Sequence, residues 1–258
     1  MTSFIKQRAD APAAFFEAEA AGLAWLRRAP EGVRVASVIR TEPGLIELER
    51  VPEVRPTPEA AHEFGAALAR THAAGAAAFG ARPDGWTGPL FIGRREMPAT
   101  NESSWGAFYA RDRVLPFLEV ALGVGNVAPA HEDKIRAACE LVASGVLDDS
   151  DEPSRIHGDL WAGNVLWSPD GVVLIDPAAH GGHRETDLAM LDLFGCPFFD
   201  EVIAGYETTS PLRAGWRDRV GLHQLHPLAV HAAGHGPGYG VALWRAAQSV
   251  LALPEQQG

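Results

Sequence analysis

The chain has 258 residues, 47% of them hydrophobic, which is enough for one large domain or two coupled lobes with a packed core. Its formal net charge of -11 argues against a surface that binds nucleic acid through clustered Lys and Arg. Two cysteines are too few for a disulfide framework, and no apolar run approaches the ~18 residues of a membrane span. We therefore expect a cytoplasmic protein without a membrane or nucleic-acid partner.

The first part of the chain, residues 1–52, predicts a small α+β lobe. Apolar residues follow strand or helix periods in short runs that end at turn residues. The expected elements are a strand end at residues 3–6, a helix at 15–28, and strands at 33–39 and 45–51, the last two joined by a turn at 41–44. Three prolines in residues 52–58 indicate a connector to the next part of the chain.

The remainder, residues 53–258, predicts a larger and mostly helical lobe. Residues 81–103 are rich in Gly, Pro and polar side chains, so a long surface loop that could border a pocket is expected there. The acidic run at 148–152 is most simply a solvated turn. The other expected elements are helices at 59–74, 105–122 and 131–144, short β runs at 155–157 and 172–175, and helices from there to the end.

One segment carries a recognisable chemical pattern. His157, Gly158 and Asp159 are followed five residues after the aspartate by Asn164, and Asp176 comes directly after the second short β run. This is the H-x-D-x-x-x-x-N loop and later strand-end aspartate of protein-kinase-like phosphotransferases. Each residue alone is commonly an ordinary polar turn residue, but the four together at these intervals favour a catalytic site.

The residue types suit phosphoryl transfer. A carboxylate on a loop, Asp159, can orient a hydroxyl and take its proton. Mg²⁺ prefers oxygen ligands, so Asn164 and Asp176 can hold it against nucleotide phosphates. We expect the β runs at 155–157 and 172–175 to lie side by side as a short hairpin that brings these groups together. His157 is expected to brace the loop.

At this point the sequence resembles a known family. The runs HGDLWAGNVLW, LIDPAAHGGHRETDLAMLDLFG and AGYETTSPLRAGWRDRVGLHQLHPLAVH closely resemble the fructosamine kinases, also called ketosamine kinases. The likeness extends upstream through FFEAEAAGLAWL, LIELERV, HAAGAAAFG and SSWGAFYARDRVLP and so covers nearly the whole chain. Aminoglycoside and choline kinases share the His-Asp-Asn-Asp core but look less similar.

The resemblance implies roles for further residues. Lys6 would contact the nucleotide phosphates and pair with Glu19, although from spacing alone both read as solvated surface residues. Glu49 falls at the hinge that would present backbone groups to the adenine. Asp187 falls where related kinases support the catalytic loop with a buried carboxylate.

Trp161, His183 and Arg184 are candidate substrate contacts. Trp161 could stack against a sugar, though a tryptophan at such a place is as often part of the core. His183 and Arg184 could face the transferring phosphate or the substrate, with an internal ion pair to Glu185 as the alternative.

The beginning of the chain departs from the family pattern. Family members normally carry roughly two more strands before this lysine, joined by a small-residue turn that covers the phosphates, whereas five residues precede Lys6 here. The small lobe is therefore expected to lack its first strands and the phosphate-covering loop. Such a lobe would expose a strand edge, so we expect a monomer, with a homodimer as the alternative.

Four C-terminal histidines offer one further pattern: His223, His226, His231 and His235. A zinc site is conceivable, but matching Cys, Asp or Glu ligands are absent and the Leu- and Ala-rich surroundings favour core or capping histidines.

Taken together, the residues and the resemblance predict a bilobal, protein-kinase-like α+β fold. The resemblance implies ATP-dependent, Mg²⁺-supported phosphorylation of a sugar hydroxyl of a ketosamine, free or protein-bound, at the 3-position used in the family. The phosphorylation would support deglycation. The alternatives are a kinase for another alcohol, such as an aminoglycoside or amino alcohol, and a catalytically impaired nucleotide-binding protein.

Overall fold

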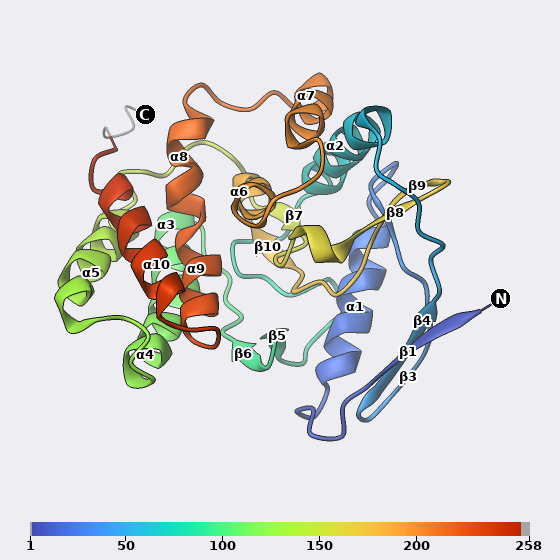
Figure 1. The fold of residues 1–258 in the computed structure, drawn as a ribbon, viewed down its shortest axis with the longest axis horizontal. Helices are drawn as coiled ribbons and strands as arrows, with labels where there is room; N and C mark the ends of the chain where they lie inside the picture. The colour runs from blue at the N-terminus through green and yellow to red at the C-terminus, as the bar shows by residue number, and fades with distance from the viewer. Residues whose placement is uncertain (1, 254–258) are drawn as a thin grey trace.

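The computed structural model describes residues 2–253 and arranges them as a row (Figure 1). A small sheet with α1 (Phe15–Arg27) forms one end, a bundle of helices forms the other, and α6 (Arg184–Phe194) lies between them with two short β pairs. None of the helices in this described part is both long and apolar enough to cross a bilayer. The mixture of small sheets and a mainly helical portion agrees with the predicted α+β class.

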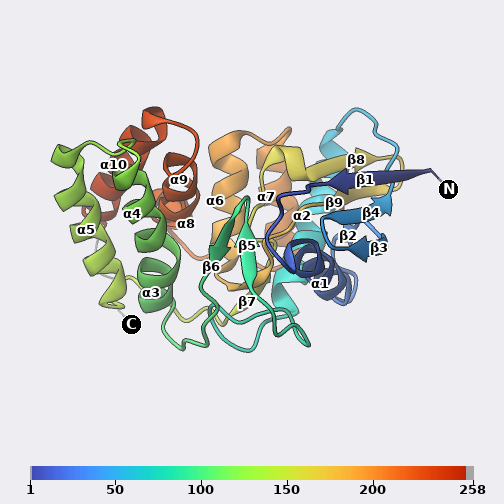
Figure 2. The ribbon, with the colours of Figure 1, turned by 90° about the horizontal axis from the view of Figure 1, so that it is seen from below.

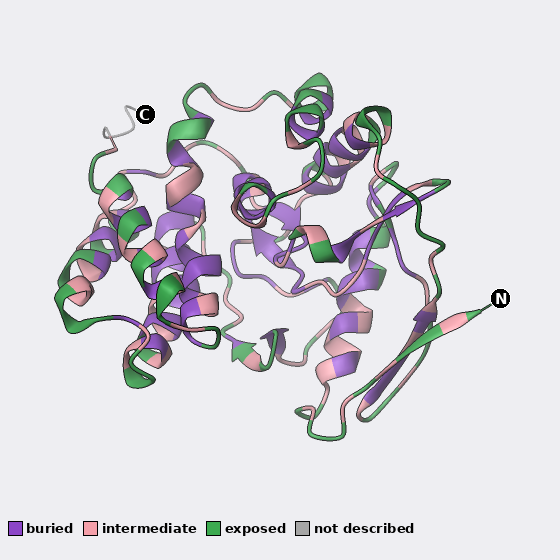
Figure 3. Ribbon diagram, in the orientation of Figure 1, coloured by how far each residue is buried: buried purple, intermediate pink, exposed green. Residues whose placement is uncertain are grey.

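The small sheet has the order β1-β4-β3 and is antiparallel. Its strands are β1 (Ser3–Gln7), β3 (Val38–Glu42) and β4 (Leu45–Glu49), with Lys6 opposite Ile46. Ile46 and Leu48 of the central strand are buried against α1, whereas β1 lies at the edge with Phe4 and Ile5 about half exposed (Figure 3). The strand expected at 33–39 is split into β2 (Arg34–Val35) and β3.

The second sheet corrects one expectation about the catalytic segment. β9 (Gly171–Leu174) pairs with β8 (Val165–Ser168) as an antiparallel hairpin and with β2 in parallel, whereas β7 (Ser154–Ile156) pairs with β10 (His180–Gly182). The predicted hairpin between the runs at 155–157 and 172–175 is therefore wrong. The tight turn at 168–171 makes β8 the nearest partner of β9, and the loop before β8 separates it from β7.

Two helices that pack near the second sheet approach each other closely. They are α2 (Pro58–Ala73) and α7 (Phe199–Thr209), which lie side by side in Figures 1 and 2. A Cβ at Gly65 would meet the carbonyl oxygen of Val202, and one at Gly205 would meet that of His62. Glycine at both positions therefore sets the short distance between the helix axes.

The helical end has its own buried core of Leu, Val, Ala and aromatic side chains. Its helices are α3 (Trp105–Phe108), α4 (Leu115–Gly123), α5 (Pro129–Ala143), α8 (Trp216–His223), α9 (Leu225–Ala232) and α10 (Pro237–Val250). The single helix expected at 105–122 contains a π-helical stretch, η1 (Tyr109–Val114), between α3 and α4. This stretch carries Arg113, whose buried guanidinium donates to Pro98 O and His180.

The segment at 81–103 is more ordered than a plain loop. It contains a hairpin of β5 (Leu90–Ile92) and β6 (Arg95–Met97), which stands beside α1 in Figure 2. All three residues of β5 are buried, and they border a cavity, as expected for this segment.

The acidic run at 148–152 is not the solvated turn that was expected. Only 6% of the Asp149 side chain is exposed. Asp148 accepts hydrogen bonds from Ser104 Oγ and the Gly106 N–H at the start of α3, and Asp151 pairs with Arg184. Three acidic side chains of this run therefore face cations or helix N–H groups, whereas Ser150 and Glu152 are exposed. A run of charges in the sequence does not reveal such partners.

A second hydrophobic cluster crosses the predicted boundary at residue 52. It combines Leu23 of α1 and Ile46 of β4 with Leu68 of α2 and Val173 of β9. The division into lobes of residues 1–52 and 53–258 stays a prediction.

Candidate active site

The loop between β7 and β8 carries His157 and Asp159, and its shape depends on glycine. Gly158 has φ of 79°, and a Cβ there would meet the carbonyl oxygen of Ala178. His157 Nδ1 accepts a hydrogen bond from the Asp159 N–H at 3.2 Å, and Nε2 donates to the Ile175 carbonyl oxygen at 2.9 Å. The histidine thus ties the loop to the end of β9.

Asp159 is half-buried beside Asn164. The Asn164 Nδ2 donates to the backbone oxygen of Asp159 at 2.8 Å and lies 3.4 Å from its Oδ2. Burial raises the pKa of Asp159 to about 7, and the negative charge of Asp176 adds to the rise. A carboxyl group with such a pKa can accept a proton near neutral pH.

Lys6, Glu19 and Asp176 form one ion-paired group. Lys6 Nζ lies 2.9 Å from Glu19 Oε2 and 2.6 Å from Asp176 Oδ1. Burial by itself lowers the pKa of Lys6, but the two carboxylates outweigh it and the net shift is upward. Burial also raises the pKa of Glu19 to about 7, against the attraction of Lys6. Asp176 has φ of 55°, a left-handed conformation that costs about 1 kcal/mol and indicates that its surroundings fix the carboxylate.

Asp187 in the first turn of α6 holds the loop from beneath. Its carboxylate accepts hydrogen bonds from the backbone N–H groups of His157 at 2.7 Å and Gly158 at 2.9 Å, and from His72 Nε2 at 3.1 Å. Burial alone would raise the pKa of Asp187, but these donors hold it below its usual value. Asp187 therefore connects α6 directly to the loop that bears Asp159.

Sequence reasoning missed His72 and Tyr206. His72, at the end of α2, is buried between Asp187 and the Tyr206 hydroxyl, which lies 2.8 Å from His72 Nδ1. Because Nε2 donates to Asp187, Nδ1 accepts from Tyr206. His72 and Asp187 are 115 positions apart, and no spacing rule connects them. A histidine among the apolar positions of a helix was the only local signal.

Two cavities meet at Lys6 and Asp176. The larger, about 380 Å³, lies between the small sheet and the end of β9, and its walls include Phe4, Leu48, Glu49 and Ile175. The smaller, about 130 Å³, lies between α1, the β5–β6 hairpin and the catalytic loop, and its walls include Phe15, Glu19, Phe91 and Asp159. Asp159 lines only the smaller cavity, whereas Lys6 and Asp176 line both.

Comparison with known proteins agrees with the resemblance seen in the sequence. The family model for fructosamine kinase matches residues 1–253. The chain belongs to the fructosamine kinase family. A probable ketoamine kinase from Enterococcus faecium is 32% identical over 241 residues, which are 92% of this chain and 83% of that protein.

Two solved structures are similar to the chain, the first in sequence and fold and the second in fold. A Thermobifida fusca protein, provisionally named fructosamine-3-kinase, is 44% identical, with a TM-score of 0.90 over 97% of this chain and 86% of that one. A Haemophilus somnus protein with the same provisional name is 23% identical, with a TM-score of 0.81 over 97% and 84% of the two chains, and shows the same fold. The protein is thus a phosphotransferase of the sugar-amine kinase type with a kinase-like fold.

The likeness to fructosamine kinases implies roles for Glu49 and Trp161, and only Glu49 lines one of these cavities. Glu49 ends β4 and lines the larger cavity, and its Oε1 accepts a hydrogen bond from the Ser37 N–H at 3.2 Å. Trp161 lies on the catalytic loop with 42% of its surface exposed, and its ring covers Gly163. Trp161 lines neither cavity, so any contact with a substrate would be made from the rim.

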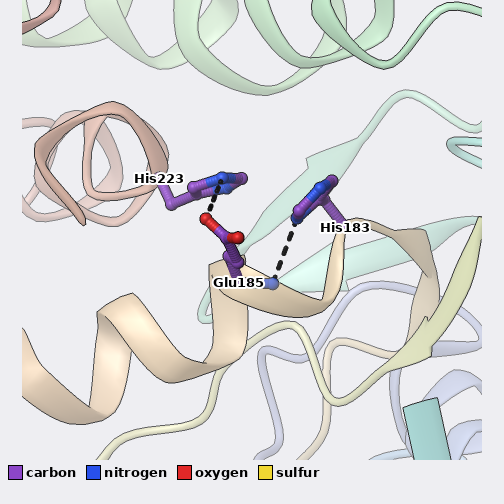
Figure 4. A group of neighbouring side chains, drawn as sticks. All are labelled: His183, Glu185 and His223. Atoms are coloured by element: carbon purple, nitrogen blue, oxygen red, sulfur yellow. Dashed lines mark hydrogen bonds and ion pairs between the residues drawn. The ribbon is translucent and has the colours of Figure 1, made fainter. Parts of the chain in front are cut away.

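His183 and Arg184 lie outside both cavities and are engaged in internal contacts. His183 Nδ1 accepts a hydrogen bond from the Glu185 N–H at the start of α6 (Figure 4), and its Nε2 lies 3.3 Å from Asp149 Oδ1. Arg184 Nε donates to Asp151 Oδ2 at 2.6 Å. Their ion-pair partners are therefore in the acidic turn rather than at Glu185.

The cluster of His183, Glu185 and His223 in Figure 4 has metal-ligand atoms within 4.8 Å of one another. However, Arg219 donates to both oxygens of Glu185, at 2.5 and 3.1 Å. A guanidinium at this position opposes a divalent cation, so the cluster is an internal hydrogen-bond network. The structure confirms His223 and His226 as core histidines, because both are fully buried.

The nucleotide-associated metal implied by a kinase fits Asn164 and Asp176. Asn164 Nδ2 is used by Asp159, which leaves the amide oxygen as an acceptor to which no residue within 2–253 donates. Asp176 presents one oxygen to Lys6 and is 37% exposed, so its other oxygen remains available. The Ile175 N–H donates to the Asn164 carbonyl oxygen at 3.2 Å, which brings the two segments together. Oxygen donors of this kind suit Mg²⁺.

Proposed function

We propose that the protein transfers the terminal phosphoryl group of ATP to the 3-hydroxyl of a ketosamine, with Mg²⁺ as the accompanying metal. The observation that carries this proposal is the pair of cavities with a shared wall at Lys6 and Asp176. ATP would enter the larger cavity, and the acceptor would occupy the smaller one, where Asp159 is. Family membership supports a sugar amine as the acceptor.

On the nucleotide side, Lys6 would contact the phosphates while Glu19 holds its ammonium in place. Glu49 lies at the wall of the larger cavity where the adenine would pass, with its side chain turned to Ser37. Asn164 and Asp176 would hold Mg²⁺, which neutralises charge on the transferring group.

On the acceptor side, Asp159 would accept the proton of the attacking hydroxyl. The hydroxyl oxygen forms a bond to the terminal phosphorus, the bond from that phosphorus to the bridging oxygen breaks, and its electron pair leaves with ADP. His157 and Asp187 would keep Asp159 in position through the loop contacts described above. Trp161 would reach the sugar only from the rim, and His183 and Arg184 would have no part in the transfer.

Phosphorylation next to the ketosamine carbonyl would destabilise the bond between sugar and amine and so support deglycation. The acceptor could be a free fructosyl amino acid or a glycated side chain on a protein. Gly93, at the turn of the β5–β6 hairpin, is exposed and lines the smaller cavity, which is compatible with both.

A coupled assay for ADP release with fructosyl-lysine, ATP and Mg²⁺ tests the proposal. The expected result is turnover that requires all three. Selective turnover of an aminoglycoside or amino alcohol would replace the substrate assignment. Nucleotide binding without transfer to any of these acceptors would instead identify a catalytically impaired protein.

A further inference from the structure

One wall of the smaller cavity is aromatic and has no part in the transfer step. Phe15 begins α1, Phe91 is the middle residue of β5, and both line the cavity that contains Asp159. Their ring centroids are 5.3 Å apart with an interplanar angle of 58°. Arg8 stacks over the Phe15 ring at 4.8 Å. The two rings therefore form a braced surface in the wall of the cavity that Asp159 also lines.

Phe91 differs from its neighbours in what it packs against. Leu90 and Ile92 belong to the hydrophobic cluster of the helical end, as the alternation of side chains along a strand allows. Phe91 belongs to neither hydrophobic cluster, although only 9% of it is exposed. A large apolar ring that lines a cavity and is held in neither of these clusters can contact a ligand.

The charges in the same cavity are unbalanced. Its walls carry three carboxylates, on Glu19, Asp159 and Asp176, and one ammonium, on Lys6. Lys6 lies within 3 Å of both Glu19 and Asp176. Asp159 has no ion-pair partner within residues 2–253, and the only hydrogen bond of its carboxylate there is the long one from Asn164. Even with Mg²⁺ at Asn164 and Asp176, the carboxylate of Asp159 would have no cation of its own, so a ligand with a positive charge would complement it.

We infer, on the basis of the proposed function, that Phe15 and Phe91 form the subsite for the protonated amine of the acceptor and the first atoms of its substituent. A ketosamine carries its amine on C1, two carbons from the 3-hydroxyl, so a hydroxyl at Asp159 places the amine in the same small cavity. Aromatic faces attract cations, and their apolar surface suits an alkyl substituent. The acceptor class is therefore a cationic, N-alkylated amino sugar, and a neutral sugar would match neither the wall nor the carboxylate.

Phe91→Ala tests this inference through steady-state kinetics with fructosyl-lysine and with fructose. We expect the KM for fructosyl-lysine to rise about tenfold, while kcat and the KM for ATP change by less than about twofold. Phe91→Leu keeps most of the side-chain volume but has no ring, so its KM for fructosyl-lysine should lie between those of the unaltered protein and Phe91→Ala. Any turnover of fructose should be affected far less, because fructose has no amine.

Phe4→Ala is the matched control, since Phe4 lines only the larger cavity. It should raise the KM for ATP and leave the KM for fructosyl-lysine unchanged. The inference is overturned if Phe91→Ala raises both KM values equally, or neither. Absence of ketosamine turnover by the unaltered protein would reject the proposed function. Calorimetric binding of fructosyl-lysine would then test the subsite on its own. Loss of binding in both Phe91→Ala and Phe91→Leu would support the subsite, and binding retained in both would reject it.

Discussion

The ammonium of Lys6 lies 2.6 Å from the carboxylate of Asp176, although the two residues are 170 positions apart. This contact joins β1, the edge strand of the small sheet, to the segment that follows β9. It also forms the shared wall of the two cavities, so the predictions below begin with the groups around it.

Asp159→Asn should lower kcat by about 10²-fold or more, because the amide keeps the shape of the side chain but is not a base. The pH profile gives a second readout. The pKa of Asp159 is raised to about 7 by burial, so kcat/KM of the unaltered protein should fall as the pH drops through 7 and the carboxylate takes up a proton. Equal rates for the two proteins would show that Asp159 is not the base.

Lys6 and Glu19 should be coupled in a double-mutant cycle. Lys6→Met leaves the carboxylate of Glu19, of which 7% is exposed, without its cation. Removing both with Lys6→Met and Glu19→Gln should therefore cost less than the sum of the single changes, by about 1 kcal/mol in the free energy of unfolding. Urea titration measures this. Additive effects would mean that the interaction between Lys6 and Glu19 contributes nothing to folding. The single and double variants that carry Lys6→Met should also bind ATP more weakly.

His72→Ala should lower kcat about tenfold while nucleotide affinity is kept, because Asp187 loses a donor and the catalytic loop loses its fixed position. Tyr206→Phe should have a smaller effect, since His72 can still donate to Asp187. His62→Ala is the control on the same helix, as no hydrogen bond of its side chain occurs within residues 2–253. If His62→Ala and His72→Ala behave alike, the effect belongs to the helix rather than to the contact with Asp187.

Gly65→Ala should destabilise the protein by about 1–3 kcal/mol, because the added methyl group overpacks the contact between α2 and α7. Separating these helices also moves Tyr206 away from His72. Gly123→Ala, at a position with open space around the missing Cβ, should leave the free energy of unfolding within about 0.5 kcal/mol of its original value. Chemical denaturation of the two variants provides the comparison, and equal stabilities would contradict the close helix contact.

Arg219→Leu should cost about 3 kcal/mol of stability, because Glu185 would be left as a buried charge without its cation. The side chains of this pair are 6% and 2% exposed. Arg217→Leu, two residues away, removes a pair with Asp200 in which both side chains are well exposed, and should change stability by less than about 0.5 kcal/mol. A large loss in both variants would argue against burial as the cause.

Much of the fold was determined by local patterns in the sequence. The helix expected at 15–28 is α1, the one expected at 59–74 is α2, and the one expected at 131–144 is α5. Helical and strand periods, proline and turn residues act over a few positions, so these elements can be read without knowledge of the rest of the chain. The order His157, Asp159, Asn164 and Asp176 likewise pointed to a kinase-like site before any coordinates.

Tertiary structure alone decided which of these segments meet. It paired β9 with β8 rather than with β7, placed His72 beneath the catalytic loop, and brought Asp149 and Asp151 of the acidic turn to His183 and Arg184. It also brought Phe91 and Asp159 into the wall of one cavity. Such contacts depend on how distant surfaces pack and on which partners satisfy buried charges. The spacing of residues along the chain gives no information on either.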